Sequence, residues 1–137
     1  MESDGPETML LTSCIEGNEE YIKSYRSKEF LKDIKDEAGR NLLIIAAYHH
    51  HYALVEFLLE NEGFDVNSVN SKGTSVLMYA KTKTLENKNY QFLDYLIQKG
   101  ANIYHRDNLG KDIFYYTDKL GNEELLAFLN QYKWKER

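Results

Sequence analysis

The amino-acid sequence predicts an all-α solenoid, in which helix-turn-helix units stack side by side and short β-hairpin fingers connect them. Three observations support this prediction: a block that recurs about every 33 to 37 residues, a helical period of apolar residues inside each copy, and glycines at a fixed turn position. Successive copies of the block begin at Asp36, Asn70 and Asp107, and a degenerate copy precedes them. A period of this length is typical of proteins whose small units bury their apolar faces against one another.

Each copy opens with a turn that leads into a first helix. The turn glycines, which can adopt positive φ at no steric cost, are Gly39, Gly73 and Gly110. The residues placed to cap the helix N-terminus with a side-chain oxygen are Asn41, Ser75, Asp112 and, by the same spacing in the degenerate copy, Thr8. A large apolar column (Leu10, Leu43, Leu77, Phe114) is followed three residues later by a small-residue column (Ser13, Ala46, Ala80, Thr117). Because residues three apart share roughly one helix face, we expect the first helices to pack closely on one another.

A second helix follows in every copy. Its apolar columns are Tyr21, Leu54, Phe92 and Leu125, then Ile22, Val55, Leu93 and Leu126, then Tyr25, Leu58, Leu96 and Leu129. Spacings of three and four dominate these columns, which indicates a helix. Gly63 and Gly100 come where a left-handed C-terminal cap is expected. The polar segment 81–89 is longer than its counterparts, and we expect it to lengthen the loop between two helices.

The order of turn, helix, short loop, helix and hairpin resembles the ankyrin repeat. The residues that carry the resemblance are Asp36-x-x-Gly39, Ala46-Ala47, Val55-x-Phe57-Leu58-Leu59, Gly63-Phe64-Asp65-Val66-Asn67 and Gly100-Ala101-Asn102. The family's Thr-Pro-Leu-His run is absent from every copy, although the capping oxygen is kept. The resemblance covers roughly residues 8–130. It implies one ankyrin-repeat domain over residues 1–137, with units at about 6–35, 36–69, 70–106 and 107–137, of which the first and last would be caps.

Composition excludes several classes of protein. The single cysteine, Cys14, excludes an internal disulfide and falls beside the small-residue column, so we expect a packed, unreactive thiol. The chain shows neither the basic start and apolar core of a signal peptide nor an apolar run long enough to span a membrane, and we expect a cytoplasmic protein. A net charge of −5 argues against general affinity for nucleic acids or anionic membranes.

The histidines are the one cluster that suggests metal chemistry. His49, His50 and His51 are consecutive, and His105 is distant. Metal ligands must converge, as residues four apart on a helix do, whereas consecutive side chains point in different directions. The run also falls where a first helix turns into a second, so we favour a loop and cap role over a zinc site. Since phosphate-binding, nucleophile-elbow and zinc-protease motifs are missing too, we predict no enzymatic activity, no cofactor and no metal.

The resemblance implies that a partner would meet the finger tips and the exposed face of the first helices. The residues of this chain at those positions are Glu37, Ala38, Arg40, Tyr48, His49, Ser71, Lys72, Thr74, Thr82, Lys83, Lys99, Asn108, Leu109, Lys111, Lys119 and Leu120. Their charged members are basic except Glu37, although the whole chain is acidic. This bias could arise by chance, or it could indicate a protein partner with an acidic surface. Tyr48 would be the aromatic anchor, because binding hot spots favour Tyr, Trp and Arg.

These observations predict a monomeric, non-catalytic protein–protein interaction module that acts as an inhibitor, an immunity-type protein or an adaptor. The alternative is a nucleic-acid or nucleotide binder that uses the basic face and the C-terminal aromatics Tyr132 and Trp134, whose rings could stack on a base. Trp134 could instead seal the apolar end of the last helix. Binding to a generic oligonucleotide that weakens steeply with salt would favour the alternative.

Overall fold

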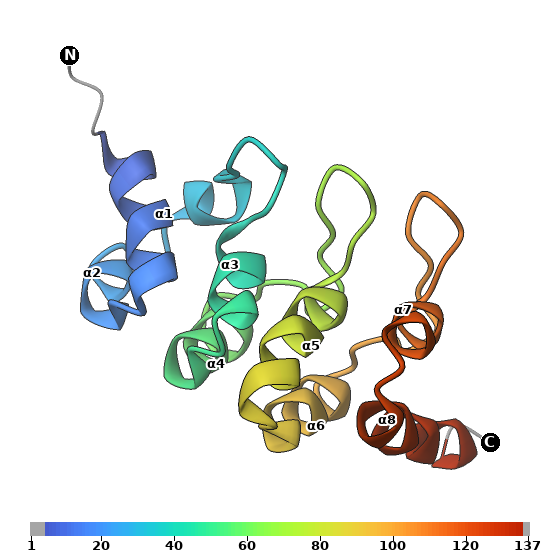
Figure 1. Cartoon of the computed structure of the whole chain (residues 1–137). Coiled ribbons are helices and arrows are strands. Elements are labelled where there is room, and N and C mark those ends of the chain that lie inside the picture. The colour runs from blue at the N-terminus through green and yellow to red at the C-terminus, as the bar shows by residue number, and fades with distance from the viewer. Residues whose placement is uncertain (1–4, 136–137) are drawn as a thin grey trace.

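Four pairs of antiparallel helices form the molecule in a computed structural model that describes residues 5–135, the side chains of residues 134 and 135 excepted. The pairs are α1 (Pro6–Glu16) with α2 (Glu19–Lys23), α3 (Leu42–Tyr48) with α4 (Tyr52–Glu60), α5 (Val76–Asn87) with α6 (Tyr90–Gln98), and α7 (Ile113–Leu120) with α8 (Glu123–Lys135). A short 3-10 helix, η1 (Glu29–Asp33), precedes the first finger. The pairs follow one another along a single axis, with three fingers projecting in the same direction (Figure 1). The predicted solenoid is confirmed.

The first helices form one row and each second helix packs on its own partner. α1 and α5 pack on either side of α3, while α7 stands further from α5. The fingers, residues 35–41, 69–75 and 106–112, contain almost no strand: one isolated bridge joins Lys35 to Asn41 and another joins Val69 to Ser75. None of the helices within the described residues combines the length and the apolar character needed to cross a bilayer.

Side-chain caps begin three of the first helices as predicted. Asn41 Oδ1, Ser75 Oγ and Asp112 Oδ1 each accept a hydrogen bond from the backbone N–H three residues later, at 2.9, 3.2 and 2.9 Å. The prediction for Thr8 is wrong, because α1 already begins at Pro6 and Thr8 lies within its first turn. Proline is well suited to this position, since its fixed φ is helical and it has no N–H that needs a partner.

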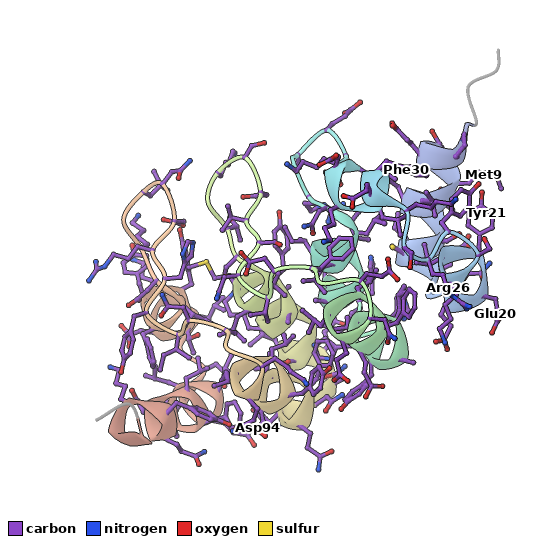
Figure 2. The ribbon with its side chains drawn as sticks, turned by 180° about the vertical axis from the view of Figure 1, so that it is seen from behind. Met9, Glu20, Tyr21, Arg26, Phe30 and Asp94 are labelled. Carbon is purple, nitrogen blue, oxygen red and sulfur yellow. The ribbon has the colours of Figure 1, made fainter. Side chains whose placement is uncertain are left out.

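The repeated apolar and small columns form the core. Leu10, Leu43 and Leu77 are completely or almost completely buried, and so is the small-residue column beside them. Cys14 is part of this core, as predicted, and burial raises the pKa of its thiol to about 12, which keeps it protonated and unreactive. The outer surface of the first unit is less polar than that expected of a capping unit, because Met9 and Phe30 are exposed on it (Figure 2).

The segment 81–89 extends a helix and does not lengthen a loop, which corrects our expectation. α5 continues through Asn87 and ends at Lys88, whose φ of 56° is left-handed. The segment contains neither proline nor glycine, and Thr84 is buried against the rest of the molecule. The side chain of Asn89 then caps α6 by accepting a hydrogen bond from the N–H of Phe92. Tertiary burial therefore favours continuing the helix.

Successive fingers lie so close together that glycine is required between them. Gly39, Gly73 and Gly110 have φ of 84°, 80° and 79°, as predicted. The backbone N–H of Ser71 donates to Ala38 O at 3.1 Å, and that of Asn108 donates to Lys72 O at 3.0 Å. A Cβ added to Gly73 would lie 2.9 Å from the backbone nitrogen of Asn108, whereas one added to Gly110, in the last finger, would meet nothing within 4 Å. The glycine of an inner finger thus serves both the turn and the contact with the next finger.

We therefore predict that G73A is more destabilising than G110A. Both variants force alanine into left-handed backbone, at a cost of about 1–2 kcal/mol. G73A should lose about 1 kcal/mol more, because the Cβ disrupts the hydrogen bond between fingers. Urea unfolding of the two variants measures the difference. Equal losses would mean that the contact between fingers contributes nothing to stability.

Candidate functional site

Most of the predicted partner-binding residues lie on or beside the fingers. Those at the finger tips are Glu37, Ala38, Ser71, Lys72, Asn108 and Leu109, and all of them are exposed. Leu109 is 74% exposed, which is unusual for a leucine and leaves an apolar side chain at the tip of the last finger. Arg40, Thr74 and Lys111 occupy equivalent positions at the finger bases, where they are half-buried.

One acidic or amide side chain holds each finger in shape. Asp36 Oδ1 accepts hydrogen bonds from the backbone N–H of Ala38 and of Arg40, at 3.0 and 2.9 Å. Asn70 and Asp107 repeat this arrangement in the next two fingers, with both bonds between 2.8 and 3.0 Å. Such Asx turns satisfy donors that would otherwise need water. The three fingers are therefore ordered by their own residues before any partner binds.

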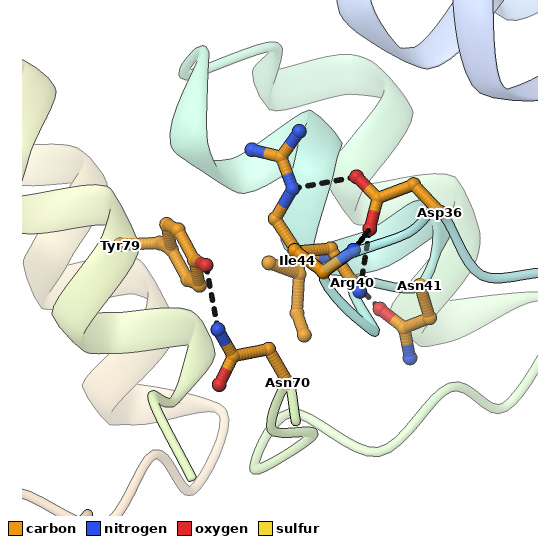
Figure 3. A network of polar contacts seen from close by, with 7 residues as sticks. Asp36, Arg40, Asn41, Ile44, Asn70 and Tyr79 are labelled. Carbon is orange, nitrogen blue, oxygen red and sulfur yellow. Dashed lines mark hydrogen bonds and ion pairs between the residues drawn. The ribbon is translucent and has the colours of Figure 1, made fainter. Parts of the chain in front are cut away.

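The second polar atom of each of these side chains links the finger to a first helix or to an arginine. Asp36 Oδ2 accepts a hydrogen bond of 2.7 Å from Arg40 Nε, and Asn70 Nδ2 donates to the hydroxyl of Tyr79 at 2.8 Å (Figure 3). In the last finger the hydroxyl of Tyr116 donates to Asp107 Oδ2. Tyr79 and Tyr116 were not among the predicted functional residues. Their signal was available, since both stand nine residues after the finger residue that they contact.

Arg40 lies between two aromatic rings in the groove between α3 and α5. Its guanidinium carbon is 6.0 Å from the ring centre of Tyr48 and 5.8 Å from that of Tyr79. The two tyrosines also contact each other edge-on, with ring centres 5.8 Å apart. Partial burial alone would raise the pKa of Asp36, but the hydrogen bonds and the charge of Arg40 outweigh it and hold this pKa below its usual value. Tyr48, the predicted anchor, is thus half-buried and fixed by its neighbours.

The rest of the predicted set divides between two regions. The residues along the first helices are Tyr48, His49, Thr82, Lys83, Lys119 and Leu120, and each is half-buried or exposed. Lys99 lies elsewhere: it follows α6, in the layer of second helices, where its Nζ is 2.9 Å from Glu60 Oε2 of α4. The structure therefore does not bring Lys99 together with the other residues of the set.

We call the surface formed by the finger tips, the finger bases and the exposed sides of α3, α5 and α7 the finger face. Its cations differ in how far they are neutralised. Arg40 is paired with Asp36, and Lys83 lies 3.6 Å from Glu86. The remaining predicted lysines, which have no ion-pair partner among the described residues, are Lys72, Lys111 and Lys119. Among the predicted cations of the finger face, these three are therefore the ones that no ion pair neutralises.

A hollow of about 300 Å³ opens in the finger face between α5 and the fourth unit. Its lining residues are Thr74, Met78, Tyr79, Lys81, Thr82, Asp107 and Tyr116. The ammonium of Lys81 lies 5.9 Å from the ring centre of Tyr116, and burial lowers the pKa of this lysine. From the sequence, Lys81 was expected to belong to a lengthened loop, and its position in this hollow was not predicted.

The histidines connect neighbouring units. The Nε2 of His51 donates to Ile15 O of the first unit and that of His50 to Ala80 O of the third, both at 2.8 Å, while His105 Nε2 donates to Gly73 O at 2.7 Å. The run does lie at the turn between α3 and α4, although His51 makes no side-chain cap. No group of three or more His, Cys, Asp or Glu side chains in the described part of the chain is arranged to hold a metal.

Of the two C-terminal aromatics, the structure describes the side chain of Tyr132. Tyr132 is buried, and its hydroxyl donates to Asp94 on α6, which Figure 2 labels. The side chain of Trp134, on which the nucleotide-binding alternative also depends, lies outside the described residues.

Comparisons with known proteins agree with this geometry. A family model described as ankyrin repeats, in three copies, matches residues 10–107. The transient receptor potential cation channel subfamily A member 1 of Homo sapiens is 26% identical over 96 residues. That match covers 70% of this chain and 8% of the channel, so the chain spans a small part of that relative's length.

The ion pair between Asp36 and Arg40 predicts that the difference in unfolding free energy between the protein and D36N depends on pH. Asparagine keeps the oxygen that holds the finger, as Asn70 shows, but loses the charge. D36N should therefore be less stable by about 1 kcal/mol at pH 7. Because the pKa of Asp36 is lowered on folding, its contribution is complete above the unfolded value of about 3.9 and is lost as pH falls through the folded value. Urea unfolding between pH 7 and pH 3 tests this, and a difference that stays constant would contradict it.

Proposed function

The chain belongs to the ankyrin-repeat family, and on this premise we propose that it is a non-catalytic module that binds a protein partner with an acidic surface through its finger face. Ankyrin repeats are generally protein–protein interaction modules. The observation that carries the proposal for this chain is that its fingers are well ordered. In each finger, one side-chain oxygen accepts two backbone hydrogen bonds that close the turn. A surface that is ordered before binding loses little conformational entropy on binding.

The charge of the finger face supports an acidic partner. Lys72 is exposed at the tip of the second finger, and Lys111 and Lys119 lie over the ring of Tyr115, at 4.8 and 5.9 Å from its centre. Lysines that form no ion pair within the protein are available to a partner's carboxylates, which they attract within about one Debye length. Tyr115 and Leu109 add exposed apolar surface to the same region. This combination of exposed aromatic, apolar and basic groups is typical of protein-binding surfaces.

The affinity for the partner would distinguish an inhibitor from an adaptor. An inhibitor or immunity-type protein would bind one partner tightly and cover its active region, whereas an adaptor would bind more weakly and leave another surface for a second protein. Apart from Lys99, the predicted binding residues lie on a single surface, and their charged members are basic except Glu37, so we favour one partner and a monomeric module.

We predict that K72E/K111E/K119E loses its partner. The triple variant reverses the three lysines of the predicted binding set that have no ion pair among the described residues, and it spares Arg40, whose loss would release Asp36. Association should slow by about tenfold or more, since complementary charge acts mainly on the association rate. The measurement is capture from a lysate of the cells that produce the protein, followed by identification of what is lost and by association kinetics with the purified partner.

The matched control is K28E/K32E/K133E. It makes the same change in net charge at lysines of η1, its N-terminal cap and α8, which lie off the finger face and, like the three test lysines, form no ion pair among the described residues. Both variants should keep the helical circular dichroism of the parent protein. Equal loss of the partner in both would show a response to net charge alone, and retention in the first would refute binding at the finger face. Capture of nucleic acid in place of protein would favour the alternative function.

A further inference from the structure

Two equivalent grooves of the finger face differ in a way that points to a specific contact. The first lies between α3 and α5 and the second between α5 and α7. Arg40, at the base of the first finger, occupies the first groove between Tyr48 and Tyr79. Its charge is matched internally by Asp36 at 2.7 Å. The first groove therefore contains both a cation and its counter-ion.

The cation of the second groove forms no ion pair among the described residues. The position of Arg40 is taken by Thr74, whose short side chain does not reach across the groove, and this leaves the hollow of about 300 Å³ described above. The cation of the second groove comes from another position of the repeat, because α5 has Lys81 where α3 has Ala47. Because Ala47 is small, α5 can pack closely on α3, whereas the long side chain of Lys81 lies between α5 and α7, which are further apart.

Lys81 has no carboxylate partner among the described residues. Asp107 lines the same hollow, but its two oxygens are already used by the N–H groups of Leu109 and Lys111 and by the hydroxyl of Tyr116. Burial alone would raise the pKa of Asp107, yet these hydrogen bonds keep it below the usual value. The half-buried ammonium thus loses water without gaining an ion pair, which is unfavourable for the free protein.

We propose that the hollow around Lys81, the Lys81 pocket, receives one Asp or Glu side chain of the protein partner. The bound carboxylate would complete in the second groove the ion pair that Asp36 provides in the first. The hydroxyls of Thr74 and Thr82 line the pocket and have no hydrogen-bond partner among the described residues, so both can donate to a carboxylate oxygen. The proposal rests on the proposed function and names the contact at its centre.

The test uses peptides, because the partner is unidentified. Random 12-residue peptides displayed on phage are selected on the intact protein, and the recovered peptides are synthesised. Dissociation constants are measured for the parent protein, K81M and K23M. K23M is the matched control, since Lys23 also lies over an aromatic ring, that of Phe57 at 5.6 Å, but belongs to α2 and is off the finger face.

We expect K81M to bind the selected peptides about 30-fold more weakly, the loss typical of truncating one partner of a buried charge pair, and K23M to bind them unchanged. Exchange of one particular Asp or Glu of the peptide for Asn or Gln should cause the same loss in the parent protein and almost none in K81M. That non-additivity is the signature of a direct contact. K81M should also keep or raise the thermal midpoint of the free protein, because methionine has no charge to desolvate, so weaker binding would not reflect unfolding.

Failure of this proposal can be told apart from failure of the proposed function. Peptides that bind K81M normally but not K72E/K111E/K119E would leave the finger face in place and overturn the Lys81 pocket. Peptides that bind both variants as tightly as the parent protein, or a selection that yields no peptides, would count against both proposals. Competition by free glutamate at micromolar concentration would show a site for small anions and would also overturn the proposal, as would a loss in K81M that is independent of every acidic residue of the peptide.

Discussion

The structure depends on a single side-chain oxygen at the start of each finger. Asp36, Asn70 and Asp107 each accept two backbone hydrogen bonds from their own finger, and this closes a turn that has almost no β-ladder. With the turn closed, the backbone of one finger can donate to the next. The same side chains also bond to Tyr79 and Tyr116 on the first helices in the second and third fingers, and to Arg40 in the first, so each finger is held by its own residues or by the helix beside it.

The repeated helices and turns form a constant frame. Differences between units at positions on this frame give the finger face its chemistry. The frame accepts Arg40 in one groove and Thr74 in the next, and it accepts Ala47 on α3 where α5 has Lys81. These exchanges leave the core columns unchanged and buried. They decide whether the cation of a groove is held in an ion pair, as Arg40 is, or lies beside a hollow without one, as Lys81 does. Such a surface can acquire specificity for a partner with little effect on the fold, because each unit contacts its neighbours alone.

The sequence was sufficient for features that recur. The turn glycines, three of four caps and the buried columns follow from spacing, because repetition shows the same physical requirement several times. It failed where a requirement occurs once: Thr8 has a capping oxygen, but Pro6 begins α1 earlier, and segment 81–89 looks like a loop until the burial of Thr84 extends α5. Lys99 and Lys81 were misjudged for a related reason. Which face of the stack a lysine reaches depends on helix length and on neighbouring units, and neither is visible in one copy of the repeat.

Amide hydrogen exchange in the free protein tests the central claim, that the fingers are ordered before binding. The decisive amides are those of Arg40, Thr74 and Lys111, each of which donates to the oxygen that closes its finger. If the fingers are ordered, these amides exchange at least about 100-fold more slowly than in an unstructured chain, in step with the helices beside them. Exchange at unstructured rates in all three, while the helices stay protected, would show mobile fingers and contradict it.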